Sequence, residues 1–575
     1  MLASESSHVR GQFTQLAITC HTFFSRSPSV CHGAVQRCSM ISNRHMKNQT
    51  NMKTRQLLID LAKRGAAVLT AVAMFATPAG FTFAAGPTSQ RQNSEQAVQR
   101  LKHIIIIYQE NWSFDSLYGQ FPGANGLQHG FDTLSQYDKS TNYTSLIYKT
   151  PQPLNNGVAD PNFPASPDGN LALWSDHSVA LPMFAFDFTN YIGADVKTGD
   201  LVHRFYHEQL QIDNGALEPK KNDLGKFVTW SDNPGLVLSY VDATDLPEGT
   251  LAQQYTLCDN FFHSAYGGSF LNHQWLIAAQ TPPWTTAIPS GWLSSYDPTT
   301  KTLLDNQLSF DGQYGVNTIQ PAKAPFSPTT TDPALRLLIN NTDPSQPGYV
   351  ETIGNRLDDA RISWKWYAGG WNVALQNNTQ AATDPNILFQ FHHQPFAYYT
   401  KYAPFLEAPD ANYTSSPPLN PDTTGPNAHL QDETQFLNDL QQNKLPTVSF
   451  IKFAGIDNEH PGYTDVVTGQ QHVADIVTAV QNSNIWNTCA IIVTYDENGG
   501  RWDHVAPPMR SDGWGTGTRV PAIIISPLAR KGYVDHTEFE TVSILKFLES
   551  RFNLAPLSAR DADPAVNDLV EAFSK

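Results

Sequence analysis

Two oxygen-rich residue pairs in this chain each follow an apolar run of the kind that forms buried strands. Glu110 and Asn111 come directly after residues 104–109 (IIIIYQ), and Asp496 and Glu497 come after residues 490–495 (AIIVTY). Short β-branched runs predict buried parallel strands, and ligands of open α/β sheets bind beyond the carboxyl ends of such strands. We therefore expect these four side chains to meet at one edge of a sheet.

The later pair begins a dense group of ionisable residues. Gly499 and Gly500 follow Glu497, and Asp503 and His504 come next. Buried carboxylates repel one another, so a buried cluster needs a cation or a shared proton, whereas a solvated acidic turn needs neither. The strand before and the glycines after favour a cation site. Because its ligands would be oxygens, one hard divalent ion (Ca²⁺, Mg²⁺ or Mn²⁺) fits better than zinc held by thiolates.

A glycine-rich turn supplies a candidate nucleophile. Ser269 follows two glycines at 267–268, with a strand expected over residues 255–262 and a helix over residues 270–279. Free N–H groups at such a helix start point at an anion. The position predicts an exposed hydroxyl whose pKa is lowered by backbone dipoles or by a metal, and a plain N-cap serine is the alternative.

Histidines gather in short stretches of the chain. His203 and His207 fall four apart within residues 200–212, which predict a helix with both on one face. The other clustered histidines are His392, His393, His460 and His504. Several stand beside carboxylates or glycine turns, which favours one polar pocket over six separate structural roles. Lys226 is a further candidate, with a solvated surface charge as its alternative.

The rest of the pattern alternates strands and helices. Further strands are expected at residues 102–109, 361–367, 445–453, 490–495 and 520–526, and further helices at 94–102, 236–240, 472–482 and 541–552. This alternation predicts an α/β fold, a three-layer αβα sandwich with a mostly parallel central sheet. Residues 119–200 and 283–350 are polar and irregular, so we expect large loop insertions there. Residues 95–575 are expected to form a single catalytic domain.

The first 85 residues differ in character from the remainder. A basic stretch at 52–55 leads into an apolar run over 65–85 with a small-residue site at 82–84. This pattern predicts a signal peptide over 52–85 rather than a membrane anchor, because Gly, Thr and Pro interrupt the run. Residues 1–51 are expected to be a non-native or disordered extension. We accordingly expect a periplasmic or extracellular protein.

Net charge limits the classes of binding partner, and the cysteines raise the question of a disulfide. Residues 1–85 hold 9 of the 37 Lys and Arg and 2 of the 53 Asp and Glu, which leaves 28 basic against 51 acidic side chains, a formal charge of −23. Such a field disfavours nucleic acid as the main partner. No stable protein partner is expected. Cys258 and Cys489 could lie on neighbouring strands and form a disulfide, or they could remain two buried free thiols.

Six motifs in order resemble the bacterial phosphoesterase family. They are residues 110–119 (ENWSFDSLYG), 203–213 (HRFYHEQLQID), 267–275 (GGSFLNHQW), 389–396 (FQFHHQPF), 457–463 (DNEHPGY) and 494–508 (TYDENGGRWDHVAPP). That family contains AcpA-type acid phosphatases and bacterial phospholipases C, with a core similar to alkaline phosphatase. The resemblance runs over nearly the whole chain after the expected leader, and it implies that fold here.

The resemblance also implies roles for individual residues. It implies that one divalent metal ion is held by Glu110, Asn111, Asp496 and Glu497, with Ser269 as both ligand and nucleophile. It implies a phosphate pocket lined by His203, Lys226, Asn272, His392, His393 and His460. The expected reaction is in-line attack of Ser269 on phosphorus and hydrolysis of the resulting phosphoserine, with His393 or His460 protonating the leaving oxygen.

Three functional hypotheses stay open. The resemblance favours a broad-specificity acid phosphatase acting on small phosphomonoesters. Phospholipases of the family typically have threonine at the position of Ser269 and continue into C-terminal β domains, whereas this chain stops soon after its last expected helix. The alternative is a phospholipase C that cleaves phosphatidylcholine-type phosphodiesters. The third is a binding protein that has kept the fold without catalysis.

Overall fold

The computed structural model describes residues 87–130, 135–147, 149–163, 181–182, 184–213, 222–316, 338–404 and 428–573. All of these belong to one compact unit, Ala85–Lys575. The expected signal peptide and the extension before it lie outside the described residues.

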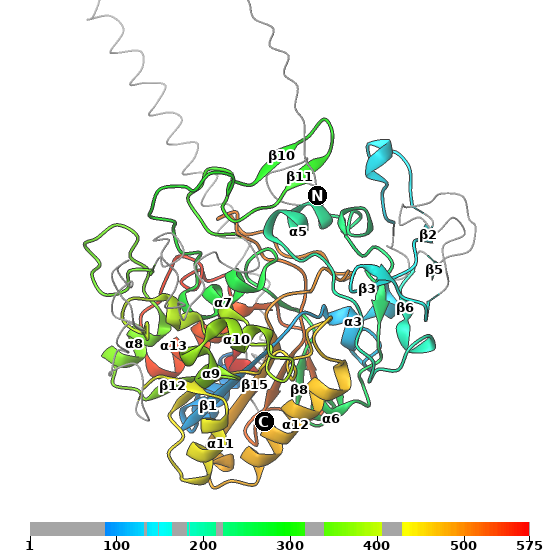
Figure 1. Ribbon diagram of the computed structural model, residues 1–575. Helices are drawn as coiled ribbons and strands as arrows, with labels where there is room; N and C mark the ends of the chain where they lie inside the picture. The colour runs from blue at the N-terminus through cyan, green and yellow to red at the C-terminus, as the bar shows by residue number, and fades with distance from the viewer. Residues whose placement is uncertain are drawn as a thin grey trace, which may run out of the picture. The chain divides into compact units, whose positions relative to one another are not determined.

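An eight-stranded sheet forms the centre of this unit (Figure 1), in the order β13-β12-β14-β1-β15-β16-β8-β17. The strands are Leu430–Asp432 (β13), Trp364–Ala368 (β12), Val448–Lys452 (β14), His103–Gln109 (β1), Cys489–Tyr495 (β15), Ala522–Ile525 (β16), Thr256–Cys258 (β8) and Tyr533–Asp535 (β17). Neighbouring strands are parallel except at β16, which pairs antiparallel with both neighbours. The expectation of a mostly parallel sheet is confirmed.

Strands β1 and β15 form the middle of the core. Ile104–Ile107 are fully buried and lie opposite Ala490–Val493, which are also buried. Such continuous apolar runs are stable only where both faces of a sheet are covered. The two strands are parallel and in register over their full length, from His103 opposite Cys489 to Gln109 opposite Tyr495. They therefore end together at one edge of the sheet.

Helices cover both faces, as the three-layer prediction requires (Figure 1). One layer contains α6 (Pro247–Gln254), α11 (Thr434–Gln441) and α12 (Val466–Gln481), and the other contains α7 (Ser269–Ala278), α8 (Ile353–Asp359) and α13 (Thr541–Phe552). In α12, Val473, Val477 and Val480 turn inward at helical spacing, and the Asp465 side chain caps its first turn. Two shorter helices, α9 (Trp371–Gln376) and α10 (Asn378–Thr383), pack against each other, and α9 also contacts β13.

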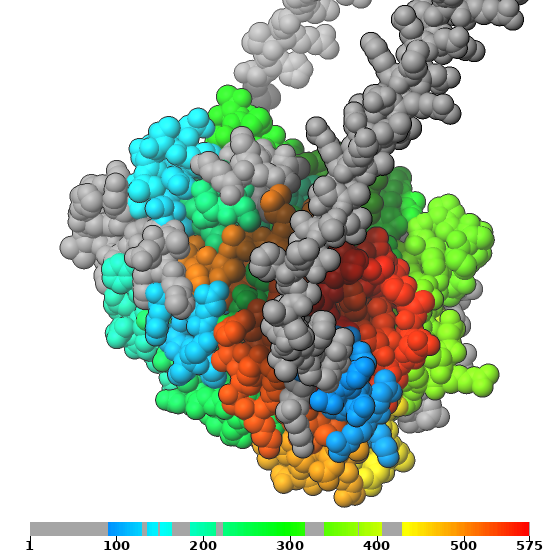
Figure 2. Space-filling view, turned by 180° about the vertical axis from the view of Figure 1, so that it is seen from behind, coloured from blue at the N-terminus to red at the C-terminus, as the bar shows by residue number. Residues whose placement is uncertain are grey.

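The first and last described elements pack together on the side shown in Figure 2. Helix α2 (Pro87–Gln99, blue) lies against η9 (Leu569–Phe573, red). The guanidinium of Arg91 donates to both carboxylate oxygens of Asp568 at 2.7 Å. This bidentate pair fixes the start of the described chain to its end.

The described parts of the two expected insertions lie outside the main sheet. They form short pairs with neighbouring segments, namely β2 (Lys149–Thr150) with β5 (Leu181–Pro182), β3 (Leu154–Asn155) with β4 (Val158–Ala159), β6 (Phe186–Asp187) with β7 (Ser239–Tyr240), and the hairpin β10 (Ser295–Asp297) with β11 (Thr302–Leu304). The short helices α3 (Phe114–Tyr118), α4 (Leu127–Gly130) and α5 (Phe205–Gln211) border them. Among all the residues that the structure describes, no helix has the length and apolar character that a membrane span requires.

Several expected elements are wrong in type or extent. The helices expected at 94–102 and 472–482 begin earlier, at Pro87 and Val466. The helix expected over 200–212 begins only at Phe205, because Arg204 has an extended backbone. Residues 236–240 form a turn and strand β7 rather than a helix, an ambiguity inherent in short apolar runs. The strand expected over 255–262 divides into β8 and β9 (Phe261–Phe262), and β9 pairs with β18 (Phe539–Glu540) outside the main sheet.

The two cysteines do not lie on neighbouring strands. Strand β16 separates β8, which carries Cys258, from β15, which carries Cys489. Both are buried free thiols, and burial raises the pKa of each. Of the two alternatives, the pair of free thiols is therefore correct.

Candidate active site

The carboxyl ends of three adjacent strands supply the centre of the site. Lys452 ends β14, Glu110 follows β1 and Asp496 follows β15. All three side chains are fully buried. Because these strands are parallel neighbours, their polar ends meet at one edge, as the sequence predicts for Glu110 and Asp496.

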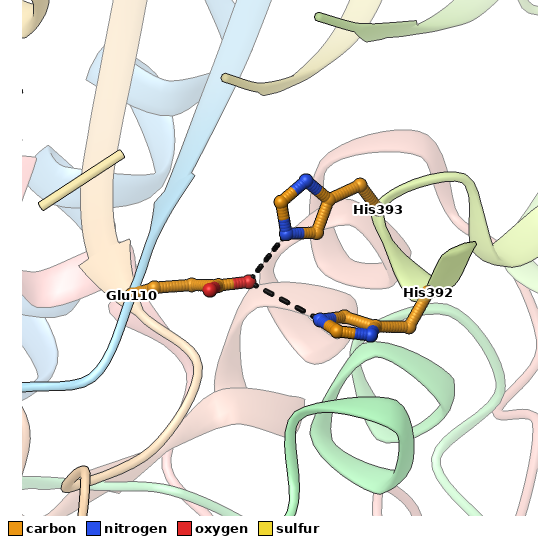
Figure 3. A group of neighbouring side chains, drawn as sticks. All are labelled: Glu110, His392 and His393. Carbon is orange, nitrogen blue, oxygen red and sulfur yellow. Dashed lines mark hydrogen bonds and ion pairs between the residues drawn. The ribbon is translucent and has the colours of Figure 1, made fainter. Parts of the chain in front are cut away.

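Glu110 is held through one carboxylate oxygen. Its Oε1 accepts from His393 Nε2 at 2.7 Å and His392 Nε2 at 3.3 Å (Figure 3). The same oxygen lies 2.9 Å from the Lys452 ammonium. Burial acts to raise the pKa of Glu110, but Lys452 and the two imidazoles together hold it well below its ordinary value. The carboxylate is therefore ionised, with Oε2 lying 3.8 Å from His460 Nε2.

The second half of the site brings Asn111, His203 and Glu497 together. Asn111 adopts a left-handed backbone (φ 70°), a conformation that asparagine tolerates better than most residues. Its Nδ2 lies 3.3 Å from His203 Nε2, which in turn lies 3.6 Å from Glu497 Oε1. Gly499 follows with φ 62°, and a Cβ there would collide with the Asn111 carbonyl oxygen. Only glycine lets the two strand-end loops approach so closely.

Ser269 is the first residue of α7, directly after the N-cap Gly268 (φ 85°). Its Oγ donates to Glu497 Oε1 at 3.5 Å. The side chain is fully buried, so the expectation of an exposed hydroxyl is wrong. Asn272 braces the turn before Ser269, accepting from Ala265 N at 3.1 Å and donating to Ala265 O at 3.0 Å.

Four of the six clustered histidines converge here, and two do not. His392 and His393 lie in η6 (Phe391–His393), and burial lowers the pKa of both, that of His393 to about 3. His203 and His460 pack edge to face with ring centroids 5.6 Å apart. By contrast, His207 Nδ1 bonds Asp305, and His504 Nδ1 bonds Asp115 at 2.7 Å. The single six-histidine pocket is therefore wrong.

Asp503 also lies apart from the strand-end carboxylates Glu110, Asp496 and Glu497. Its Oδ1 accepts from Arg519 Nε at 2.8 Å, and the same guanidinium reaches Asp115 Oδ1 at 2.9 Å. A buried arginine thus neutralises this pair, and no cation is needed there. The network instead ties the loop after Glu110 to the loop after Glu497.

Lys226 is buried, so its alternative as a solvated surface charge is wrong. Its ammonium lies 2.6 Å from Asp213 Oδ1 and 4.1 Å from the ring centroid of Tyr143. These contacts engage it with a carboxylate other than those of the strand ends. Its place in a phosphate pocket stays a prediction.

Two further buried residues belong to the site but were not singled out from sequence. Lys452 could have been suspected as the one basic residue closing an apolar strand. His273 lies one helical turn after Ser269 and donates from Nδ1 to the Ser269 carbonyl oxygen at 2.8 Å. Burial lowers the pKa of His273 well below its ordinary value. One ligand atom each from Glu110, His273 and Asp496 lies within 4.8 Å of the others.

The oxygen atoms of the proposed ligands fit one hard cation. Among the proposed ligands, three buried oxygens have no hydrogen-bond partner within the described part of the chain: Glu110 Oε2, Asn111 Oδ1 and Asp496 Oδ2. Burial also raises the pKa of both Asp496 and Glu497 well above ordinary carboxyl values. Buried acceptors without donors are rare in proteins, and a divalent cation with oxygen preference would satisfy all three.

Residues 101–555 match the family model described as the Phosphoesterase family. Phospholipase C B of Mycobacterium tuberculosis is 24% identical over 514 residues, covering 82% of this chain and 78% of that protein. The non-hemolytic phospholipase C of Burkholderia pseudomallei is 25% identical, and that of Pseudomonas aeruginosa is 23% identical. These alignments cover 79% and 91% of this chain, but only 56% and 63% of the two relatives.

Among solved structures, the chain is similar to a phosphonate monoester hydrolase of Agrobacterium radiobacter, with a TM-score of 0.30 and 10% identity over 82% of this chain and 77% of that one. A protein in the alkaline phosphatase superfamily from Vibrio parahaemolyticus gives a TM-score of 0.27 and 10% identity, covering 55% of this chain and 64% of that one.

Proposed function

The chain belongs to the phosphoesterase family, and from this premise we propose that it is a phospholipase C, which hydrolyses the phosphodiester of a phospholipid head group. The observation that carries the proposal is that the three relatives described above are all named phospholipases C, with alignments over 79% to 91% of this chain. Phospholipase C activity therefore ranks ahead of the acid phosphatase that the sequence resemblance favoured.

The proposed nucleophile is the Ser269 hydroxyl. A divalent cation held by Glu110, Asn111, Asp496 and Glu497 would supply Lewis-acid activation of that hydroxyl and of the phosphoryl oxygens. Ser269 Oγ gives up its proton, for which Glu497 Oε1 is the acceptor within reach, and forms a bond to phosphorus while the bond from phosphorus to the glycerol oxygen breaks. This step releases diacylglycerol and leaves the phosphorylated head group on the serine. Water then hydrolyses the phosphoserine and releases that head group.

Two histidines are oriented toward the reacting group. His203 Nδ1 and His460 Nδ1 face the backbone oxygens of Leu201 (2.6 Å) and Pro461 (2.5 Å). Because a carbonyl oxygen only accepts, each Nδ1 carries the hydrogen, and each Nε2 turns to the interior. We assign His460, in the form that carries hydrogens on both ring nitrogens, the delivery of its Nε2 proton to the leaving glycerol oxygen, and His203 a contact with the phosphoryl group. The expected alternative acid, His393, already donates from Nε2 to Glu110, and burial lowers its pKa to about 3, so it fits that role less well.

An acid phosphatase is the second candidate, and the residue type at Ser269 favours it. Both reactions begin with the same attack on phosphorus and differ in the group that leaves. The size and side chains of the pocket that accepts the leaving group, rather than the nucleophile, decide between the two reactions.

Substrate competition tests the proposal. Purified protein supplied with Ca²⁺, Mg²⁺ or Mn²⁺ is assayed on phosphatidylcholine vesicles, bis-p-nitrophenyl phosphate and p-nitrophenyl phosphate. We expect release of phosphocholine and diacylglycerol, with a higher kcat/KM for the lipid than for the monoester. Faster monoester hydrolysis would establish the phosphatase instead. No turnover of any substrate with metal present would support a binding protein.

A further inference from the structure

Glu208 of α5 is a fully buried carboxylate that gathers four hydrogen-bond donors from three other segments. Its Oε1 accepts from His263 Nε2 at 2.9 Å, from Asn498 Nδ2 at 3.0 Å and from Thr518 N at 3.1 Å. Its Oε2 accepts from Gly267 N. The Ser269 hydroxyl bonds Glu497 rather than Glu208, so the influence of Glu208 on the site passes through the segments it holds.

Two of those segments carry the proposed chemistry. Gly267 stands two residues before Ser269, and Asn498 directly follows Glu497. Asn498 Oδ1 also accepts from Gly500 N at 2.8 Å, so it shapes the turn after Glu497. One carboxylate thus joins the nucleophile turn to the loop that bears two proposed metal ligands. The 3.5 Å contact of Ser269 Oγ with Glu497 Oε1 spans the same two segments.

The groups around Glu208 suit a side chain with two acceptor oxygens. Asn498 Nδ2, Thr518 N and Gly267 N can only donate. His263 Nδ1 faces the Ala265 carbonyl oxygen at 2.8 Å while its Nε2 faces Glu208 at 2.9 Å, so the ring is held between the two. A glutamine in place of Glu208 would direct its NH₂ group against one of these donors, whereas a carboxylate accepts on both oxygens.

We propose that Glu208 is a positioning residue for the reaction: it fixes the turn at Gly267 against the loop at Asn498, and so holds the Ser269 hydroxyl in register with Glu497. The proposal rests on the proposed function only in taking Ser269 as the nucleophile. It is independent of which phosphate ester is the substrate, because Glu208 acts on the attacking group and not on the leaving group.

The test compares Glu208→Gln with Asp439→Asn. Asp439 is also buried and paired, through Lys365 (2.6 Å) and Tyr367 (2.8 Å), but it lies on α11 away from the strand-end loops. For Glu208→Gln we expect kcat to fall about 10- to 100-fold on bis-p-nitrophenyl phosphate and on lipid alike, with KM within about twofold, because small misplacement of a reacting group has costs of this size. Asp439→Asn should lower the melting temperature and leave kcat unchanged.

Orthovanadate, a mimic of the pentacoordinate phosphoryl transition state, gives a readout without turnover. By calorimetry we expect Glu208→Gln to bind it about tenfold or more weaker than wild type does. If wild type hydrolyses no lipid but this difference is found, the phospholipase proposal fails and the positioning proposal stands. A Glu208→Gln protein with lowered melting temperature, unchanged kcat and unchanged vanadate affinity would overturn it. If the glutamine variant does not fold, Glu208→Asp, which keeps the charge on a shorter side chain, is judged by the same criteria.

Discussion

Individual side chains in the site are oriented by their own backbone neighbours. Nδ1 of His203, His460 and His273 each faces a backbone oxygen at 2.5 to 2.8 Å. This repeated pattern fixes the tautomer of each ring and determines which nitrogen faces the interior. The ring orientations therefore depend on short local contacts as well as on the packing of the site.

Replacing Ser269 with alanine tests the nucleophile assignment. We expect turnover to fall by at least about 1,000-fold, because the variant lacks the proposed nucleophile. Within the described ranges the hydroxyl makes one long hydrogen bond, at 3.5 Å, so the free energy of unfolding should change by less than about 1 kcal/mol. Steady-state kinetics and thermal melting measure the two effects.

A buried serine elsewhere in the sheet supplies the control for that substitution. Ser526 is fully buried at the end of β16, and its Oγ donates to the Cys489 carbonyl oxygen at 2.7 Å. Ser526→Ala should lose about 1 kcal/mol of stability and keep its activity. Substantial activity in Ser269→Ala would show that another group attacks phosphorus.

At the scale of elements, the site depends on the parallel strands β14, β1 and β15 ending together at one edge of the sheet. Helix α6 packs at this edge from one face. Glu248 of α6 accepts from Tyr495 OH at 3.2 Å, at the end of β15, and Tyr495 also reaches both oxygens of Glu459 at 3.0 Å. Both carboxyl groups are fully buried. Gln109, the last residue of β1, donates to Glu459 Oε1 at 3.1 Å. Glu459 thus links the ends of β1 and β15, and Glu248 joins it at the end of β15.

This acid pair makes stability depend on pH. Burial raises the pKa of Glu248 from 4.5 to about 7, and burial together with Glu248 raises the pKa of Glu459 well above its ordinary value. The folded protein therefore keeps protons that the unfolded chain releases near pH 4.5. Stability should fall as the pH rises from about 4.5 through about 7, because the folded state binds more protons over that window.

Glu248→Gln tests this element-scale effect. The amide removes one ionisation and can still donate to Glu459, so the fall in stability with pH should flatten. At pH 8 the variant should be more stable than wild type by on the order of 1 to 2 kcal/mol, measured by denaturant unfolding across pH 4.5 to 8. Glu95→Gln, at an exposed position on α2, should follow the wild-type curve. A variant curve parallel to wild type would show that the pair is not the source.

At the scale of the whole molecule, the proposed cation joins loops that follow strands far apart in sequence. Removing it with a chelator should abolish turnover and lower the melting temperature, because the buried carboxylates of Asp496 and Glu497 lose their counter-charge. A metal present at 100 to 1,000 times its Kd stabilises a fold by about 3 to 4 kcal/mol. Differential scanning calorimetry with and without chelator measures this loss.

Returning Ca²⁺, Mg²⁺ and Mn²⁺ separately would identify the cation that restores both activity and melting temperature. Elemental analysis of the purified protein provides an independent identification. Asp439→Asn should respond to the chelator as wild type does, since Asp439 is neutralised by Lys365. Unchanged activity and an unchanged melting temperature after chelation would contradict the cation site.

Local sequence patterns predict much of this architecture. The runs before Glu110 and Asp496 are continuous apolar segments bounded by polar residues, so they identify buried parallel strands and the edge where ligands bind. The glycines before Ser269 locate a tight turn at a helix start in the same way. These features depend on residues close together in the chain, which is why the sheet and one half of the site could be predicted.

Only the tertiary structure decided which distant groups share a carboxylate. Lys452 contacts Glu110, Arg519 neutralises Asp503, and Glu208 receives donors from Gly267 and Asn498. No periodicity or spacing encodes these pairs, because each joins segments brought together by the packing of separate strands and loops. The same packing buried Ser269 and set β16 antiparallel. The sequence by itself determined where the polar strand ends lie, and the long-range contacts decided which of them face the proposed cation.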